Sequence, residues 1–454
     1  MWPQAVLDTL ADAGDRTVFE AGQEHVSGAR MTELIRRVAA GLRRAGIGPG
    51  DGLVLQLGVH PEAFAAVFAA FTVGARVAGV RADQLAEVLP EADAELIDEP
   101  RLAELLATPD DGAPLVAAGR PGDIARVIYT SGSTGAPKGC CQTYAAMTAA
   151  WAAHPDRWPP AIRALAARLD RYLVFGSLTS QVMVEYGVLT LAAGGRLVAA
   201  RPPGFPAAIT RHRATASVIT VGKLHQLVRD QLADPADLSS LRALMVSGSP
   251  LEEGRLAEAL DVLGPVIFHG YGQTETGMIA MVTPDEFPAA LATVGRPAVE
   301  TSLRDGELYV RTPAQASSYW RDPAETAEVF VDGWVRTRDL AALGDDGYLR
   351  LSGRVRDVII VHAELVHAGP VERALAGHPD VAEAYVIGRP DAETGEAPHA
   401  FIVPATGREP DPDELRALVS GPGRPRTITL IDRVPVAASG KPDKEALRLF
   451  APFS

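Results

Sequence analysis

A run of hydroxyl and glycine residues, closed by a proline and a lysine, lies in the first third of the chain. Residues 127–143 read VIYTSGSTGAPKGCCQT. The polar and glycine positions of this run are Thr130, Ser131, Gly132, Ser133, Thr134, Gly135 and Lys138. Glycines let successive backbone N–H groups point inward as an anion-binding nest, and the hydroxyls and the ammonium add donors. The run therefore predicts a phosphate-binding loop.

The flanks of this run indicate where such a loop would sit. The Walker pattern does not fit, because its lysine follows a glycine directly whereas Lys138 follows Pro137. The segments ARVIYT before the loop and GCCQT after it both read as strands, so the loop is predicted at the tip of a β-hairpin. A solvated Gly/Ser turn without a ligand is the alternative reading of the run alone.

Composition and charge limit the possible partners. The chain has 454 residues, of which 47% are hydrophobic, and its formal net charge is −14. An acidic chain of this kind is not expected to bind nucleic acid or an anionic membrane. Its two cysteines, Cys140 and Cys141, are adjacent and so rarely able to bridge, and the N-terminus shows no signal-peptide pattern. These features predict a cytoplasmic protein.

The elements around the loop are expected to alternate between helix and strand. An amphipathic helix is predicted over 31–47, strands over 52–58 and 75–81, and a buried helix over 62–74 between them. Residues 100–123 contain Pro, Asp and Gly and are predicted as a loop. Further strands are expected at 172–177, 196–200, 216–220, 243–248 and 265–272. This pattern is typical of a layered α/β domain.

The pattern of predicted elements changes after about residue 300. Short strands with turn signals, such as GELYVRT and GYLRLSG, predict a small β region, and helices and strands alternate again after GRVRDVIIV. The predicted fold class is α/β, with a large N-terminal domain of layered α/β subdomains plus this β region, and a small mobile α+β C-terminal domain. We place the domains at 1–353 and 354–454.

Four motifs in order extend the interpretation of the glycine-hydroxyl loop. The loop, GYGQTETG at 270–277, DGWVRTRDLAALGDDGYLRLSGR at 332–354 and SGKPDKEALR at 439–448 together resemble the signatures of the adenylate-forming superfamily. This superfamily includes acyl-CoA synthetases, nonribosomal-peptide adenylation domains and luciferases. The resemblance covers about residues 30 to 450 and implies activation of a carboxylic acid by ATP and Mg²⁺, with release of pyrophosphate.

The resemblance also implies roles for individual residues. The loop would cradle the β- and γ-phosphates, Thr274 would donate to the α-phosphate, and Glu275 would hold Mg²⁺. Tyr271 would stack on the adenine opposite Gly248, Ser249 and Pro250, while Asp339 would accept from the ribose hydroxyls and Arg354 would contact the ribose and phosphate. Taken alone, Tyr271 also reads as a core aromatic, Asp339 as a turn cap and Arg354 as a surface ion pair.

The resemblance further implies that the small domain moves. Lys441 would reach between the carboxylate and the α-phosphate during adenylation, and a hinge at Arg356 would then rotate the domain toward an acceptor. Family members commonly have SGGEN after the hinge, where glycines let pantetheine pass. Here His362 and Ala363 replace the two glycines, which puts thiol transfer in question but leaves adenylation unaffected. A local repacking that keeps the tunnel open is the alternative.

The acid pocket is expected to include Gln181, Glu185, Met278 and Ile279, together with Ser249. Gln181 stands where peptide synthetases place an aspartate for the amino-acid ammonium, and Glu185 follows four residues later. An α-amino acid is therefore disfavoured, although Glu185 could substitute, and the mixed lining favours a small aryl or functionalised acid.

Three functions remain open from the sequence. The first is an acid–thiol ligase that uses CoA or carrier-protein phosphopantetheine as the acceptor. The second passes the adenylate to an amine or another small nucleophile, as amide-forming members do. The third is a luciferase-like oxygenase or a nucleotide binder without turnover, which the presence of Thr274, Glu275 and Lys441 disfavours.

Overall fold

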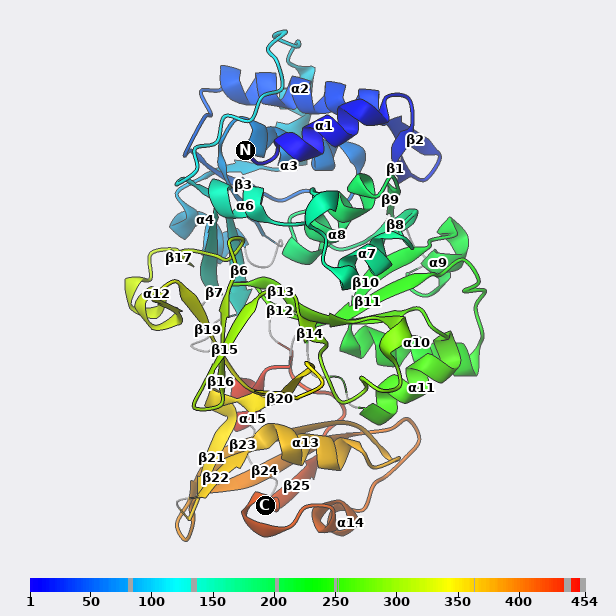
Figure 1. The fold of residues 1–454 in the computed structure, drawn as a ribbon, viewed down its shortest axis with the longest axis vertical. Helices are drawn as coiled ribbons and strands as arrows, with labels where there is room; N and C mark the ends of the chain where they lie inside the picture. The colour runs from blue at the N-terminus through cyan, green and yellow to red at the C-terminus, as the bar shows by residue number, and fades with distance from the viewer. Residues whose placement is uncertain are drawn as a thin grey trace.

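The computed structural model describes residues 1–80, 85–131, 137–200, 204–248, 251, 253–362, 364–436 and 442–449. Its strands form four sheets, three of which belong to the long N-terminal part of the chain. Figure 1 shows this part above a small C-terminal unit that is coloured yellow-orange to red. The predicted fold class, with a large layered α/β part and a small α+β unit, is confirmed.

The first sheet has nine strands in the order β14-β13-β12-β11-β10-β8-β9-β1-β2. Their bounds in chain order are β1 Thr17–Ala21, β2 Glu24–Ser27, β8 Arg171–Val174, β9 Arg196–Ala199, β10 Ala216–Thr220, β11 Ala243–Ser247, β12 Ile267–Gln273, β13 Gly277–Val282 and β14 Arg296–Pro297. From β12 to β1 every neighbouring pair is parallel. Parallel neighbours need crossover connections, which the helices α8 Gln181–Ala192, α9 Ala207–His212, α10 Val221–Ala233 and α11 Glu253–Leu263 supply.

The second sheet has six strands and contains the hairpin of the glycine-hydroxyl run. Its order is β17-β7-β6-β4-β3-β5. The strands are β3 Gly52–Leu55, β4 Arg76–Gly79, β5 Glu95–Ile97, β6 Ile124–Ser131, β7 Pro137–Thr143 and β17 Ser318–Tyr319. The helices of this region are α1 Gln4–Ala13, α2 Gly28–Arg44, α3 Pro61–Thr72, α4 Leu85–Ala92, α5 Glu99–Ala107, α6 Tyr144–Ala149 and α7 Pro160–Ala166.

One prediction for this region was wrong. Residues 100–123 were expected to form a loop, but α5 occupies Glu99–Ala107. Asp98 caps this helix by accepting a hydrogen bond from the backbone N–H of Arg101, and Pro100 lies in its first turn. Proline is tolerated there because the first backbone N–H groups of a helix have no intrahelical partner. The proline that suggested a loop therefore marks the start of a helix.

The third sheet and the small unit follow in the second half of the chain. The third sheet consists of β15 Glu300–Arg304, β16 Glu307–Arg311, β18 Phe330–Val331, β19 Trp334–Leu343 and β20 Leu349–Arg354, with α12 Pro323–Val329 beside it. The small unit contains β21 Val358–Val361, β22 Glu364–His367, β23 Val381–Asp391, β24 Gly395–Pro404 and β25 Thr427–Leu430, with α13 Ala368–Ala376, α14 Pro412–Ala417 and α15 Lys444–Arg448. Only a 3₁₀ turn at Val355–Asp357 separates the two sheets along the chain.

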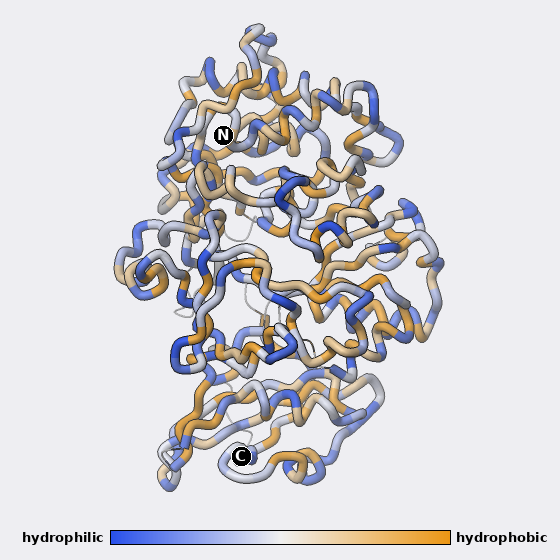
Figure 2. Tube along the Cα trace, in the orientation of Figure 1, coloured by the Kyte–Doolittle hydropathy of each residue, from blue (hydrophilic) through white to orange (hydrophobic). Residues whose placement is uncertain are grey.

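The largest hydrophobic core joins the first two sheets around α3. Almost all of α3 is buried, and Phe68, Ala69 and Ala70 are fully so. Figure 2 shows hydrophobic stretches of chain in every sheet and hydrophilic stretches on the outer loops. Within the part of the chain that the structure describes, no helix is long and apolar enough to cross a membrane.

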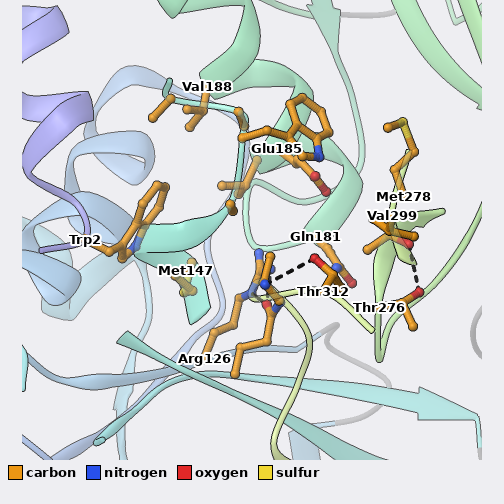
Figure 3. A pocket seen from close by; sticks show the side chains of 18 residues that line it. Trp2, Arg126, Met147, Gln181, Glu185, Val188, Thr276, Met278, Val299 and Thr312 are labelled. Atoms are coloured by element: carbon orange, nitrogen blue, oxygen red, sulfur yellow. Dashed lines mark hydrogen bonds between the residues drawn. The ribbon is translucent and has the colours of Figure 1, made fainter. Parts of the chain in front are cut away.

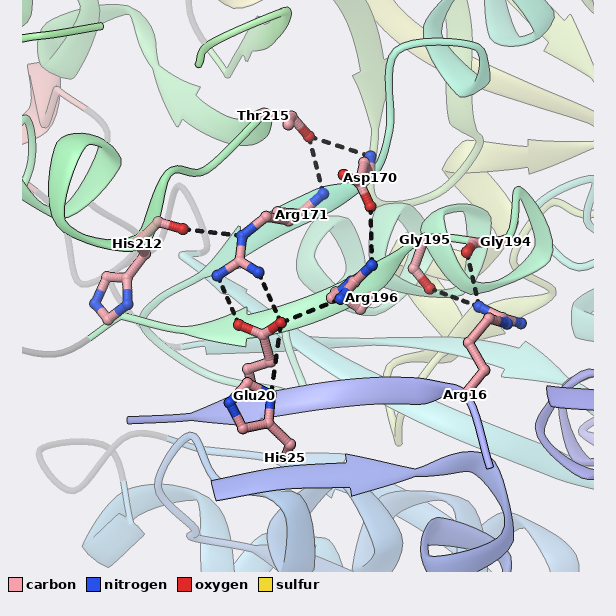
Figure 4. A network of polar contacts seen from close by, with 10 residues as sticks. All are labelled: Arg16, Glu20, His25, Asp170, Arg171, Gly194, Gly195, Arg196, His212 and Thr215. Carbon is pink, nitrogen blue, oxygen red and sulfur yellow. Dashed lines mark hydrogen bonds and ion pairs between the residues drawn. The ribbon is translucent and has the colours of Figure 1, made fainter. Parts of the chain in front are cut away.

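A buried carboxylate on β1 links this strand to arginines on β8 and β9 of the same sheet. Glu20 of β1 is 4% exposed, and its two oxygens accept hydrogen bonds from Arg171 Nη1 at 2.7 Å and Nη2 at 2.6 Å. Arg196 lies 3.5 Å from the same carboxylate, and Arg171 also donates to the carbonyl of His212 (Figure 4). Since β1 is the neighbour of β9, this network holds the N-terminal strand β1 in place beside the parallel strands of the sheet.

Replacing Glu20 with glutamine should destabilise the fold without touching the candidate site. The substitution leaves two guanidinium groups without their carboxylate, but both are partly exposed and can rehydrate. We therefore expect a loss of about 2 kcal/mol, less than for a fully buried pair. Urea unfolding of Glu20→Gln beside the unmodified protein measures this loss, and an unchanged unfolding midpoint would show that the network contributes nothing.

Candidate active site

The glycine-hydroxyl run lies at the tip of a β-hairpin, as the sequence predicts. β6 and β7 pair antiparallel, with Thr130 opposite Lys138 and Ser131 opposite Pro137. Residues 132–136, which include the predicted phosphate ligands Gly132, Ser133, Thr134 and Gly135, lie outside the described residues. The register nevertheless fixes Lys138 at the base of the loop, three residues after Gly135 in the sequence.

Lys138 lies beside an acidic residue of α12. Its ammonium is 3.1 Å from Oε1 of Glu325, and Arg338 Nη1 is 2.7 Å from the same oxygen. Burial alone would raise the pKa of Glu325, but the hydrogen bonds from Lys138 and Arg338 lower it below its usual value. A carboxylate therefore holds Lys138 and Arg338 together next to the loop.

A distortion in β19 directs Asp339 into the site. Between the pairs Tyr309–Arg336 and Glu307–Leu340, β19 contains two more residues than β16, which is a bulge. Within this bulge Arg338 has a φ of 59°, a left-handed conformation that non-glycine residues seldom adopt. Bulges of this kind re-aim side chains next to functional sites, and here the result is that Asp339 is 3% exposed and faces inward.

The carboxylate of Asp339 accepts hydrogen bonds from three donors on two strands, β12 and β20. Oδ2 accepts from the hydroxyl of Tyr271 and from Nε2 of Gln273, both at 2.6 Å, and Oδ1 accepts from Nε of Arg354 at 2.8 Å. Burial and the neighbouring Asp339 raise the pKa of the Tyr271 phenol well above its usual value, and Asp339 raises the pKa of Arg354. The structure thus brings together Tyr271, Asp339 and Arg354, the predicted adenine and ribose contacts.

A turn between β12 and β13 carries the next predicted residues. Thr274 and Glu275 are half-buried in this turn, between Gln273 and Gly277, which pair across the hairpin. Oε1 of Glu275 accepts a hydrogen bond from the hydroxyl of Tyr319, and its backbone carbonyl accepts from the N–H of Ala316. Oε2 of Glu275 receives no hydrogen bond from any described residue, so it fits a role as an oxygen ligand for a hard cation.

The same hairpin leads into a cavity. The cavity contains about 620 Å³ of empty space, its open mouth included. Its lining residues are Trp2, Arg126, Gln142, Met147, Ala150, Trp151, Ala152, Ala153, Gln181, Val184, Glu185, Val188, Thr276, Gly277, Met278, Val299, Thr312 and Ala314. Gln181, Glu185 and Met278 were predicted as pocket residues and do line it (Figure 3).

The side chain of Ile279 does not line this cavity. Successive side chains of a strand point to opposite faces, and Ile279 faces away from Met278. Its side chain is fully buried in a cluster with Leu308, Val310 and Leu349 of the third sheet. Ile279 is therefore a core residue that joins two sheets, and the expectation that it lines the acid pocket does not hold for this cavity.

The cavity also contains a buried arginine that the sequence analysis missed. Arg126 of β6 is 8% exposed and donates from Nε and Nη2 to Oε1 of Gln142 on β7, and Gln142 Nε2 donates to the carbonyl of Ala314. Burial lowers the pKa of Arg126 to about 10 although Glu185 opposes this. The sequence carries only a weak sign of this pair. Arg126 and Gln142 are polar residues next to Val127 and Cys141 in two otherwise apolar strands.

Several predicted residues cannot be placed. Ser249, Pro250 and Lys441 lie outside the described residues, and of Arg356 only its position in the turn between β20 and β21 is described. Gly248 follows β11 directly, has a φ of 101°, and a side chain there would meet no atom within 4 Å. Open space next to the backbone suits the wall of a ligand site.

Comparisons with known proteins agree with the site. The family model described as AMP-binding enzyme matches residues 7–97 and 83–320, and that described as AMP-binding enzyme C-terminal domain matches residues 370–441. The chain is 31% identical to feruloyl-CoA synthase from an Amycolatopsis species, over 94% of each protein.

Two solved structures extend this comparison. The amide bond synthetase McbA from Marinactinospora thermotolerans is 32% identical, with a TM-score of 0.85 over 98% of each chain. The O-succinylbenzoate coenzyme A synthetase from Bacillus subtilis, solved with ATP and a magnesium ion, is 23% identical with a TM-score of 0.81, covers 98% of this chain and 99% of that one, and shares the fold. This chain therefore belongs to the AMP-binding, adenylate-forming family and is an AMP-forming enzyme of the acid–CoA ligase type that activates carboxylic acids as adenylates.

Proposed function

We propose that this enzyme activates a small aryl or functionalised carboxylic acid with Mg-ATP and then transfers the acyl group to a thiol, either of CoA or of a carrier-protein phosphopantetheine. In the first step a carboxylate oxygen forms a bond to the α-phosphorus while the bond to pyrophosphate breaks. In the second step a thiolate sulfur bonds to the acyl carbon and AMP leaves. Both reactants of the first step are anions, so donors must offset their charge.

The observation that carries this proposal is that one hairpin, β12–β13, contributes residues to both the site around Asp339 and the cavity. Tyr271 on β12 bonds to Asp339, and Thr276, Gly277 and Met278, on the β13 side of the same hairpin turn, line the cavity. The turn that contains Thr274 and Glu275 lies between them. An acid in the cavity and a nucleotide at Asp339 would therefore meet at this turn, where a hydroxyl and a carboxylate are available.

Each residue then has a role in the proposal. Lys138 and the loop from Thr130 hold the β- and γ-phosphates, Thr274 donates to the α-phosphate, and Lys441 contacts both reacting groups. Tyr271 and the backbone at Gly248 enclose the adenine. Bound Mg²⁺ would offset the negative charge of the phosphates, with Glu275 as its protein ligand.

The same proposal divides the chain into two moving parts, 1–353 and 354–454. β20 ends the third sheet at Arg354 and β21 begins the next sheet at Val358, so few residues connect them. Arg255 of α11 donates to the carbonyl of Val381, one contact that would break on rotation. Arg356 lies in the connecting turn, where a hinge has the fewest contacts to disturb.

A second acceptor, an amine, is favoured by the hairpin of β21 and β22. Val361 pairs with Glu364, so His362 directly follows the paired end of β21. His362 is exposed and has a φ of 50°, the left-handed conformation that glycine adopts at less cost. The turn therefore keeps a backbone shape suited to glycine but carries side chains, which would narrow a path for pantetheine.

Replacing His362 and Ala363 with glycine should increase the rate of thioester formation if these side chains obstruct the thiol. The backbone at His362 already has a φ that glycine accepts, so the turn should persist in the double variant. The measurement is transfer of a preformed acyl-adenylate to CoA by the variant and the unmodified enzyme. A fast unmodified rate that does not change in the variant would contradict steric obstruction.

The proposal as a whole is tested by pyrophosphate release over a panel of carboxylic acids, followed by mass spectrometry of the products. Each acid that releases pyrophosphate is offered CoA, phosphopantetheine and a primary amine in competition. A predominant thioester supports thiol transfer, whereas a predominant amide assigns the second acceptor. Pyrophosphate release with no acyl product of either kind would contradict both.

A further inference from the structure

The cavity contains a carboxylate that has no hydrogen-bond donor. Glu185 belongs to α8 and points into the cavity, toward the space that Arg126 also faces (Figure 3). No residue in the described part of the chain donates a hydrogen bond to it. The surroundings are largely apolar or aromatic, and they include Trp151, Val184 and Val188. Glu185 is half-buried, so its carboxylate loses part of its water in these apolar surroundings, and this disfavours its charged form.

Arg126 does not satisfy this carboxylate. Its Nε and Nη2 both donate to Gln142, which is in turn held by the carbonyl of Ala314. The guanidinium therefore acts on Glu185 as a nearby charge and not as a hydrogen-bond donor. Burial raises the pKa of Glu185 to about 7, and the charge of Arg126 limits this rise. Tyr186, the next residue of α8, is the other titratable group that interacts with Glu185.

The position of Glu185 along α8 defines which part of a ligand it would meet. Gln181, Val184, Glu185 and Val188 form one stripe of the helix toward the cavity. Gln181 lies at the end next to Gly277, where its Nε2 is 4.0 Å from the position of an ideal Cβ on that glycine. Glu185 is one turn farther from the hairpin, about 6 Å along the helix axis. It would therefore face the part of the acid remote from its reacting carboxyl group.

We propose that Glu185 determines the specificity of the enzyme by accepting a hydrogen bond from an N–H or ammonium group on the remote part of the acid substrate. This inference rests on the proposed function. Such a donor would supply the partner that Glu185 lacks, while the aromatic and aliphatic lining would contact the rest of the acid. A second carboxylate at this position is disfavoured, because it would face the carboxylate of Glu185.

Matched pairs of acids test the proposal. Pyrophosphate release is measured with an indole carboxylic acid and its N-methyl derivative, with 4-(aminomethyl)benzoic acid and 4-ethylbenzoic acid, and with terephthalic acid. The unmodified enzyme should prefer a donor-bearing acid over its matched acid by at least about tenfold in kcat/KM, the size expected for a hydrogen bond to a charged group. The first pair reports on a neutral N–H donor and the second on an ammonium.

Two variants separate recognition from folding. Glu185→Leu should remove the preference, measured as the ratio of kcat/KM values for the two acids of each pair, a ratio that a change in rate common to both acids does not alter. Glu185→Gln keeps the size and an acceptor oxygen but loses the charge, so it should retain a preference for N–H and lose that for ammonium. Thermal unfolding of each variant confirms that it is folded.

The pH dependence gives an independent readout. Because burial raises the pKa of Glu185 to about 7, the carboxylate is mostly protonated at pH 6 and mostly ionised at pH 8. The preference for the ammonium acid should therefore increase between these values in the unmodified enzyme and stay flat in Glu185→Gln.

The outcomes distinguish this inference from the proposed function. If no acid in a broad panel releases pyrophosphate, the proposed function is wrong. If acids are activated but the donor preference is absent, or survives in Glu185→Leu, then Glu185 does not select the substrate. Preference for terephthalic acid would likewise overturn the inference and assign the selective contact to Arg126.

Discussion

Replacing Asp339 with alanine is expected to lower the affinity for ATP by about 100-fold. The carboxylate is buried and lies at the meeting point of Tyr271, Gln273 and Arg354. A carboxylate has about four acceptor positions, and these three donors fill three of them. Two ribose hydroxyls would therefore compete with at least one existing donor. Losing two hydrogen bonds to a charged group, less the cost of releasing that donor, gives an effect of this size.

The measurement is a calorimetric titration with Mg-ATP, with and without an acid that the enzyme activates. Glu307→Ala is the matched control, because Glu307 is also a buried carboxylate of the third sheet and is paired with Arg336 at 2.8 Å. The control should lose stability to a similar degree and retain its ATP affinity. Equal ATP affinity in Asp339→Ala and the unmodified enzyme would remove Asp339 from the nucleotide site.

Local patterns predicted most elements of this fold. The β6–β7 hairpin could be predicted because the strands on either side of the loop alternate, and because a Gly/Ser run can only turn between them. The strands β8 to β12 were recognisable as short apolar runs that alternate with helices. Such signals depend on neighbours in the sequence, so one sequence is enough to detect them. α5 was missed because Pro100 signals both a loop and a helix start.

The composition of the cavity could not be predicted in the same way. Its walls come from Trp2 near the N-terminus, Arg126 on β6, α8 and Thr312 after β16, which are brought together only by the packing of three sheets. The bulge that turns Asp339 inward depends on Arg338 adopting a φ of 59°, for which the sequence carries no turn residue. Glu185 was predicted from the sequence as a pocket residue, but only the structure shows that no described residue donates a hydrogen bond to it.

Replacing Lys441 with alanine should affect the two half-reactions differently. Lys441 itself is outside the described residues, but its segment leads into α15, where Lys444 lies 2.6 Å from Asp357 and 2.8 Å from Glu372. Burial acts to lower the pKa of Lys444, yet these two carboxylates raise it above its usual value. α15, which begins three residues after Lys441, is therefore tied to residues of the small unit, and we expect Lys441 to move with it.

If Lys441 moves with the small unit, it should act in adenylation but not in acyl transfer. In adenylation its charge would offset the negative charge that develops between the carboxylate and the α-phosphate, and removing one such donor typically costs about 10²–10³ in rate. In acyl transfer the rotated unit would carry Lys441 away from the reacting atoms. Lys441→Ala should therefore strongly slow acid-dependent pyrophosphate release but leave transfer from a supplied acyl-adenylate nearly unchanged.

Lys138 provides the contrast, because it belongs to β7 of the large part and does not move with the small unit. Lys138→Ala should act mainly on ATP affinity, since its ammonium lies at the base of the predicted phosphate loop, beside Glu325 of α12. Both half-reactions are measured for each variant, using pyrophosphate release for the first and the acyl product formed from synthetic adenylate for the second. Equal slowing of both halves in Lys441→Ala would show that this lysine stays at the reacting atoms throughout, and rotation of residues 354–454 would then not separate the two steps.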